Sequence, residues 1–438
     1  MTGAFRWLLV AALVAPTLAS FVRDAWYPPA VAALWLAFAA LVALRNLAGP
    51  FPAEPDWKTL AFLAPAIVGA VQLVAEATAH RRATAVEAVL WLSVAMLYVA
   101  ARSVLRDTQV LERFLHATLA MGAGITAVSL MQFLTSNGRI YWLIDTDLEH
   151  VMGPFRNRNH FAAFVELMLP FALVRTFDGR NRAAYGITAA AMTLAVALGG
   201  SRMGIVLCGI EWALIAWLAG ARSSHKHGLS RRLVAIALAA GTIAAGLWTT
   251  SLRDDGHRRE MAASTLDLIR SRPLAGHGLG AYETVYPRVA RFDNGLIVDH
   301  AHNDWLEWAA EIGIPATLPL LAIVIWLAAQ LPRVPWAAGP LAVATHALVD
   351  FPLHKPALVG WFVVLVAAVA VKCENRSAYA GSGIAAPFTA SQSSSDCSNG
   401  FSERDTATSR AAQNASEKSR LNWNMFARSS APGNPNVR

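Results

Sequence analysis

The chain has 438 residues, of which 55% are hydrophobic and only 15% are charged, and its net charge is +8. Soluble globular proteins carry roughly 25% charged residues, and the charges here are concentrated between long apolar stretches. This pattern excludes a soluble enzyme and a disordered protein. The three cysteines have no paired spacing, which excludes a disulfide scaffold. The stretches do not alternate as barrel strands would, so we expect an all-α polytopic membrane protein.

Twelve apolar stretches are long enough to cross a membrane, because a hydrocarbon core of about 30 Å requires about 20 helical residues. The first stretch resembles a signal peptide, but its cleavage site is weak, and we expect an uncleaved helix. Ser201 and Arg202 alone separate the seventh and eighth stretches. The expected spans are 5–22, 28–45, 58–76, 83–101, 113–135, 159–176, 183–201, 203–221, 232–252, 312–331, 334–351 and 356–372.

The basic residues lie mostly at the ends of these stretches, which favours a role in membrane topology over nucleic-acid binding. Twelve spans place both termini on one side of the membrane. The loops on that side carry 14 Lys and Arg residues, whereas the short loops on the other side carry 8. Because loops rich in Lys and Arg stay in the cytoplasm, we expect cytoplasmic termini. Segment 253–301 carries seven further arginines on the opposite side, and function is one candidate reason for them.

Two segments depart from the membrane pattern. Segment 253–311 is expected to form a large loop on the outer side of the membrane, with an amphipathic helix from His257 to Arg270, a Pro/Gly turn and a second helix that begins near His300. Long loops between packed elements are usually functional or disordered, and the aromatic residues of this one argue against disorder. The tail, 373–438, is rich in Ser, Asn and Ala, so we expect it to be disordered and cytoplasmic.

Segment 299–315, with the sequence DHAHNDWLEWAAEIGIP, holds the best candidate for chemistry. A histidine at the mouth of a membrane helix suits a general base, because its pKa lies near neutrality. We assign this role to His302, which precedes Asn303. Two alternatives stay open. One is a metal site of His300, His302 and Asp304, which the spacing of the histidines disfavours. The other is a polar helix cap with aromatic anchors at the membrane interface.

Three arginines near the expected outer face are candidates for binding a phosphate. Arg156 and Arg158 belong to GPFRNRNH before the sixth span, and Arg202 belongs to GGSRMG between the seventh and eighth. Guanidinium groups bind phosphate oxygens in pairs. The alternatives are an ordinary helix entry capped by Asn157 or Asn159, and an arginine that reaches lipid head groups from the tip of a turn.

The motif THALVDFPLHKP lies at the outer end of the eleventh span. His346 and Asp350 are four residues apart, so we predict that they pair on one helix face. An ionisable pair near membrane depth is a functional hypothesis. Glu166 and Glu211 lie inside the sixth and eighth spans, where each could equally form a hydrogen bond between packed helices.

Taken in this order, the motifs resemble the O-antigen ligase/polymerase family of bacterial envelope proteins. GPFRNRNH, SRMG, RPLAGHGLG, HAHNDWLEWAAEIGIP and HALVDFPLH carry the resemblance over roughly residues 80–370, and HNDWLEWAAEIGIP is the most specific part. The resemblance implies a multi-pass protein of the bacterial inner membrane with an active site that faces the periplasm. Such proteins act on glycans linked to undecaprenyl pyrophosphate. Ligases transfer the glycan to an acceptor such as lipid A–core, whereas polymerases lengthen it.

The resemblance also implies roles for particular residues. The family's key histidine precedes Asn and corresponds to His302, and its late Asp corresponds to Asp350. Neither a metal nor any other cofactor is implied. The expected partners are a lipid-linked glycan donor, a lipid or glycan acceptor and membrane lipids, without nucleic acid. The expected site consists of His302 as the catalytic base, Arg202, Arg156 and Arg158 on the pyrophosphate, and Asn303, His346 and Asp350 in supporting roles.

A membrane transporter is the alternative from a different class. Transporters place ionisable residues near the membrane midplane on broken helices. In this chain only Glu166 and Glu211 are acidic residues well inside the spans, and the other polar residues gather at one face. This distribution favours chemistry at the membrane surface over transport.

Overall fold

The computed structural model describes residues 2–22, 24–47, 55–178, 181–222, 256–291 and 297–382, together with positions 233, 237, 240 and 241. All regular secondary structure in these residues is helical, apart from two isolated bridges. Eight of the described helices are long and apolar enough to cross a membrane. The expected all-α polytopic class is therefore confirmed. The ninth expected span, 232–252, and the tail beyond residue 382 lie almost wholly outside the described residues.

The helices follow the apolar stretches closely as far as residue 222. The eight membrane-length helices are α2 (Tyr27–Leu47), α3 (Trp57–Val74), α4 (Arg81–Leu105), α5 (Thr108–Thr135), α6 (Arg158–Asp178), α7 (Arg182–Gly199), α8 (Arg202–Arg222) and α15 (Pro356–Ser382). Two shorter apolar helices are α1 (Thr2–Leu18) and α13 (Ile314–Gln330). The remaining helical segments are α10 (Gly256–Ser271), α11 (Tyr282–Val285), η1 (Tyr286–Arg288), α12 (Asp304–Ile312), η2 (Pro335–Ala337), α14 (Ala338–His346) and η3 (Pro352–His354).

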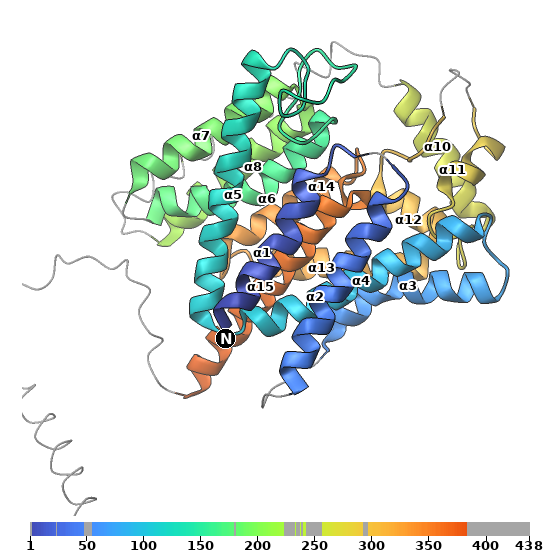
Figure 1. Ribbon diagram of the computed structural model, residues 1–438, viewed down its shortest axis with the longest axis horizontal. Helices are drawn as coiled ribbons and strands as arrows, with labels where there is room; N and C mark the ends of the chain where they lie inside the picture. Colours follow the sequence, from blue (N-terminus) through green and yellow to red (C-terminus); the bar gives the residue numbers. More distant parts are fainter. Residues whose placement is uncertain are drawn as a thin grey trace, which may run out of the picture. The chain divides into compact units, whose positions relative to one another are not determined.

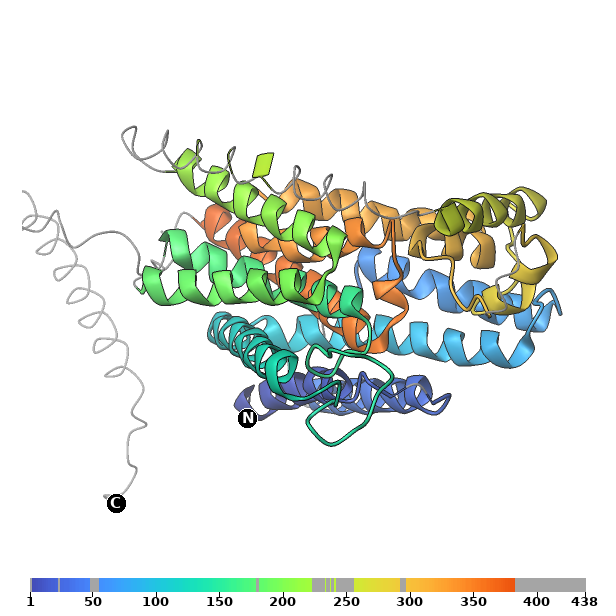
Figure 2. The ribbon, with the colours of Figure 1, turned by 90° about the horizontal axis from the view of Figure 1, so that it is seen from above.

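Helix α15 is the core of the bundle (Figures 1 and 2). Its sequence is a run of Val, Ala and Leu without charges before Lys372, and this stretch is almost entirely buried. It packs against α1 and α4, and Trp361 donates a hydrogen bond of 2.9 Å to the Thr17 hydroxyl on α1. Gly360 allows close packing, because a Cβ at this position would lie 2.5 Å from the Trp35 ring on α2. The apolar side chains of α15 thus form the surface against which several helices pack.

The eleventh expected span, 334–351, is not a single helix. After η2, helix α14 has nine residues, and at 1.5 Å per residue it is too short to cross a hydrocarbon core of about 30 Å. The helix ends at His346, and the chain turns before Pro352 begins η3. Proline disfavours helical conformation in the residue before it, so the helix cannot continue through Phe351 into the rest of the apolar stretch.

The segment between the ninth and tenth expected spans contains the predicted amphipathic helix, which is α10. The glycine-rich turn after it is bound to the end of α12: the His277 N–H donates to the Ala310 carbonyl at 2.9 Å, and the Gly278 N–H donates to the Glu311 carbonyl at 3.0 Å. Gly276 has a φ of +66°, and a Cβ there would lie 2.1 Å from the Glu311 oxygen. Figures 1 and 2 show α10 and α11 beside the ends of α3 and α4.

Helix α15 continues to Ser382, past residue 372, where the last span was expected to end. The first part of the expected disordered tail is therefore helical. Lys372 forms an ion pair of 2.8 Å with Glu112, and Arg102 forms one of 2.6 Å with Glu374. These contacts join the end of α15 to α4 and α5, at the opposite end of α15 from the segments described next.

Candidate active site

The start of α12 is fixed to the turn that follows α14. Asn303 caps α12 by accepting a hydrogen bond of 3.0 Å from the Leu306 N–H, and its side-chain amide donates to the Leu348 carbonyl at 2.8 Å. The Trp305 indole N–H donates to the Ala344 carbonyl at 2.9 Å. The Asp304 N–H also donates to the Ala347 carbonyl at 2.9 Å. Contacts from three consecutive residues, Asn303, Asp304 and Trp305, therefore hold this segment in one register against residues 344–350. This register places His302 opposite Asp350.

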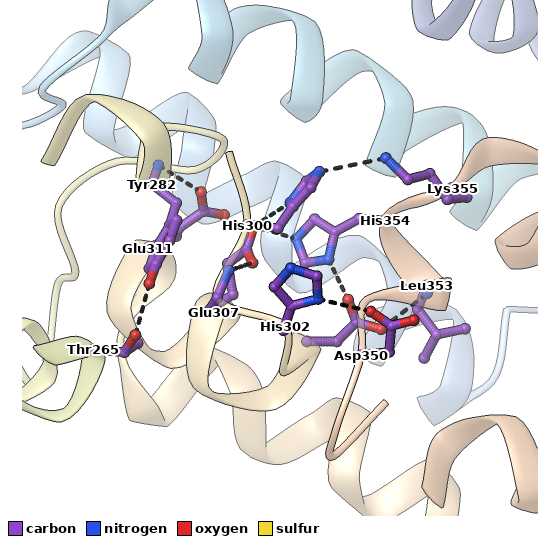
Figure 3. Close-up of polar contacts among 12 residues, drawn as sticks. Thr265, Tyr282, His300, His302, Glu307, Glu311, Asp350, Leu353, His354 and Lys355 are labelled. Atoms are coloured by element: carbon purple, nitrogen blue, oxygen red, sulfur yellow. Dashed lines mark hydrogen bonds and ion pairs between the residues drawn. The ribbon is translucent and has the colours of Figure 1, made fainter. Parts of the chain in front are cut away.

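His302 and Asp350 form a hydrogen-bonded pair, with 2.9 Å between Nδ1 and Oδ1 (Figure 3). The Asp350 side chain is completely buried, whereas 29% of the His302 side chain is exposed. Burial alone would raise the pKa of Asp350, but the hydrogen bond from His302 and the neighbouring His160 outweigh it and hold that pKa well below its usual range. Asp350 is therefore a carboxylate that fixes the Nδ1–H tautomer of His302.

Two features of His302 fit a catalytic group. Its Nε2 has no hydrogen-bond partner among the described residues, so the atom that would act as a base is available. Its backbone has a φ of +50°, a conformation that is unfavourable for a residue with a side chain and that is enriched at functional sites. The contacts of Asn303 maintain this conformation.

The predicted pair of His346 and Asp350 is wrong. His346 Nδ1 instead lies 2.8 Å from Glu166 Oε1 on α6, and both side chains are buried. The Asp350 N–H still donates to the His346 carbonyl at 3.1 Å, but the Asp350 side chain binds His302 before α12 instead of the His346 ring. Glu166 thus joins α6 to α14, as the alternative of a helix-packing hydrogen bond proposed.

A second cluster of histidines and carboxylates lies beside this pair, and the sequence analysis missed its arrangement (Figure 3). His300 Nδ1 lies 2.8 Å from Glu307, and His354 Nδ1 donates to Asp304. The other Asp304 oxygen accepts a hydrogen bond of 2.9 Å from the Leu353 N–H. Residues 299–307 and 352–354 are therefore bound together by buried carboxylates of α12, which hold η3 against the segment that contains His302.

The charges in this cluster balance one another. Burial alone would lower the pKa of His354, but the carboxylates of Glu307 and Asp304 outweigh it and raise that pKa to about 10. Burial would likewise raise the pKa of Glu307, but His354 and His300 lower it to about 2. Glu311 has no such partner, so burial and the charge of Glu307 raise its pKa to about 8. His354 is thus a buried cation between two carboxylates.

The metal site considered for His300, His302 and Asp304 is not assembled, because His302 contacts Asp350 and Asp304 contacts His354. A different set, His300, Glu307 and His354, has ligand atoms within 4.8 Å of one another. However, Glu307 and Asp304 flank His354 and keep its imidazole protonated, and a protonated imidazole cannot bind a metal. We therefore interpret this set as an ion-pair network.

The three candidate arginines lie in two places. Arg158 begins α6, and its Nη1 lies 3.8 Å from the point where a Cβ on Gly200 would be. Arg158 is therefore beside the turn that leads to Arg202 at the start of α8. Arg156 instead lines a cavity of about 590 Å³ and forms an ion pair of 2.5 Å with Asp147.

The cavity is bounded by the α1–α2 connection, the segment before α6, Asp299 and His300, and residues 351–357. Phe351 separates it from the catalytic pair. The His300 ring stacks on Phe351 with centroids 4.2 Å apart, and the His302 ring meets it edge-on at 5.0 Å. Lys355 Nζ lies 4.6 Å from the centre of the same ring. Lys355 is a cavity residue that the sequence analysis counted only as a loop charge.

Comparison with known proteins gives a match in this part of the chain. Residues 187–321 match a family model described as O-antigen ligase, and no curated protein matches the chain. The matched range includes Arg202, His302 and Asn303, whereas Arg156 and Asp350 lie outside it. Over residues 187–321, the match supports the O-antigen ligase family that the motifs indicated.

Proposed function

We propose that this protein transfers a glycan from an undecaprenyl pyrophosphate carrier to a hydroxyl group of an acceptor such as lipid A–core, at the periplasmic face of the inner membrane. The observation that carries the proposal is the pair of His302 and Asp350. A partly exposed imidazole with a free Nε2 is held by a buried carboxylate, in a chain whose residues 187–321 match O-antigen ligases.

In the proposed reaction, His302 Nε2 accepts the proton of the acceptor hydroxyl, and Asp350 stabilises the imidazolium that results. The acceptor oxygen forms a bond to the anomeric carbon of the donor glycan. The bond from that carbon to the pyrophosphate oxygen breaks, and its electron pair leaves with the undecaprenyl pyrophosphate. Attack opposite the leaving group inverts the anomeric configuration.

The leaving group gains negative charge as this bond breaks. Cationic groups that are already in place stabilise such charge without reorganisation, which is often the largest catalytic effect. Arg202, Arg158 and Arg156 are the arginines proposed for this role. Arg158 lies beside the turn that carries Arg202, and Arg156 lines the cavity next to Phe351.

An apolar groove beside the catalytic segment suits the isoprenoid chain of the carrier. Its volume is about 330 Å³, and its walls are almost entirely apolar. Trp305 and Leu348, which take part in the contacts that hold His302 in register, line one part of it. The other lining residues are Ala309, Ile314, Thr317, Leu318, Leu321, Val324, Ala344 and Thr345.

Deletion of the gene in its native bacterium tests the function. A ligase predicts loss of long glycan chains from lipid A–core while lipid-linked polymer accumulates. Surface chains shortened to a single repeat would instead identify the polymerase activity of the same family. Unchanged surface glycans and lipid-linked intermediates would contradict both, and complementation with the wild-type gene is the control.

A further inference from the structure

Lys355 is a half-buried ammonium without a carboxylate partner. Its Nζ lies 3.4 Å from His300 Nε2 and over the face of Phe351, and none of the described carboxylates forms an ion pair with it. Buried charges are normally paired. Two carboxylates whose charges act on Lys355 are engaged elsewhere, because Asp350 is bound to His302 and Glu307 to His300.

Other groups with positive or partial positive charge line the cavity next to Lys355. Pro356 and Ala357, the first residues of the 27-residue helix α15, line it, and so does Asn157, directly before α6. Long helices carry a partial positive charge at their first turn, which favours anions. Pro356 has no N–H, and the Leu358 and Val359 N–H groups donate to the Lys355 carbonyl, so the Ala357 N–H is the donor that this turn offers to an anion. Arg156 lines the cavity from the opposite segment.

A buried nitrogen provides an independent indication of a ligand. His160, in the first turn of α6, is 9% exposed and lines the same cavity, and its Nε2 has no hydrogen-bond partner among the described residues. Buried polar groups in proteins are almost always hydrogen bonded. The cavity thus holds an ammonium without a carboxylate partner, an arginine and a buried imidazole nitrogen around one space.

We propose that Lys355 binds a phosphate of the lipid pyrophosphate donor, in a site completed by the first turn of α15, Arg156 and His160. This inference rests on the proposed function and assigns a substrate-binding residue to it. Lys355 and His302 flank the same ring of Phe351. The cation for the leaving group and the base for the acceptor would therefore lie on two sides of one reacting centre.

Three carboxylates also line the cavity. They allow two explanations of the charge on Lys355 to be distinguished. Asp24 and Asp299 are exposed to solvent, whereas Glu87 on α4 is partly buried. If Lys355 serves an anionic ligand, Glu87 opposes binding of that ligand by repulsion. If Lys355 instead only balances Glu87, the loss of either charge would leave the affinity for the ligand unchanged.

The experiment measures binding to the full chain in detergent, without acceptor, by calorimetric titration with farnesyl pyrophosphate and with inorganic pyrophosphate. Lys355→Met should weaken binding of both at least about tenfold, Lys355→Arg should restore part of it, and Glu87→Gln should strengthen it. Lys372→Met, at the other end of α15, should bind as the wild type does. Equal affinities in the wild type and Lys355→Met would overturn the proposal, as would the same loss in Lys372→Met.

A second measurement needs no variant. Reductive methylation of the wild type, read by mass spectrometry, should be slowed at Lys355 but not at Lys372 by farnesyl pyrophosphate. Equal protection by phosphatidylglycerol would assign the site to a membrane lipid and overturn the assignment to the donor. Because neither measurement uses glycan transfer, pyrophosphate binding through Lys355 without any transfer would reject the proposed function and leave this site standing.

Discussion

At the scale of single residues, the proposed chemistry depends on the contact between His302 and Asp350. A general base typically contributes about 10²- to 10⁴-fold to the rate, so we expect His302→Ala to reduce transfer by this factor while donor binding persists. The measurement is glycan transfer in detergent with purified donor and acceptor at equal protein concentration. Donor binding lost together with activity would assign His302 to the pyrophosphate instead.

Two neighbouring variants separate proton transfer from packing. Asp350→Asn keeps the size of the side chain but removes the charge that stabilises the imidazolium, so it should lower kcat and leave KM nearly unchanged. His300→Ala removes a contact with Glu307 and should lower kcat less than His302→Ala does. An Asp350→Asn protein with wild-type kcat would show that the pair is only structural.

Glu311 makes the stability of α12 depend on pH. Its pKa is raised to about 8 by burial and the charge of Glu307, from about 4.3 in an unfolded chain. Between these values the folded protein holds a proton that the unfolded chain has lost, so this residue makes folding less favourable as the pH rises. Glu311→Gln removes the titration, and its amide oxygen still accepts from the Tyr282 N–H, as Glu311 does at 3.0 Å.

The measurement is thermal unfolding of the wild type and Glu311→Gln in detergent, from about pH 6 to about pH 8, the range below the native pKa of Glu311. The Tm of the variant minus that of the wild type should increase steadily with pH. Other groups, including His354, titrate in both proteins and largely cancel in this difference. Parallel curves would show that Glu311 is already ionised at the lower pH.

At the scale of elements, polar contacts in the last turns of α15 hold this helix to α4 and α5. Lys372 and Glu374 form ion pairs with Glu112 and Arg102, and the Asn375 amide donates to the Arg106 carbonyl at 3.3 Å. A chain that ends at Ser382 should insert and function as the full chain does. A chain that ends at Val371 loses these contacts, each worth up to about 1 kcal/mol for partly exposed pairs, and should unfold at a lower temperature in detergent.

Glu374→Gln in the chain that ends at Ser382 is the matched control, because it weakens one ion pair without shortening the helix. Its Tm should lie between those of the two truncated chains. Loss of activity on truncation at Ser382 would show that the tail contributes to function directly.

The helices and their contacts also show how much of the fold and of the candidate site the sequence predicts. Apolar length and end charges predicted α2 to α8 within a few residues, and amphipathic spacing predicted α10, because these signals are local. Hydropathy could not show that 334–351 breaks after His346, since the whole stretch is apolar. The pairing of His302 with Asp350 and of Asp304 with His354 joins residues 48 and 50 positions apart. Only the fold decides such contacts, although motif order did identify His302 and Asp350 individually.

At the scale of the whole described bundle, polar groups gather at the two ends of α15. Lys355 and the catalytic segment lie at its start, whereas Glu374 and its partner Arg102 lie near its other end. The loops that contain Arg45, Arg102 and Arg106 belong to the side that carries 14 basic residues. The candidate site therefore lies at the end of α15 that the charge distribution assigns to the periplasm.

This arrangement predicts the membrane topology. A phosphatase reporter, active only in the periplasm, should be inactive when fused after Ser382 and active when inserted after the exposed residue Ala290. A fluorescent reporter that matures only in the cytoplasm should give the reverse pattern, which controls for failed expression. Lipid-linked glycans meet their acceptors at the outer face, so His302 must be there for the proposed reaction. Reporters that place Ala290 in the cytoplasm would separate His302 from that donor and contradict the proposed function, while the pairing of His302 with Asp350 would still need another explanation.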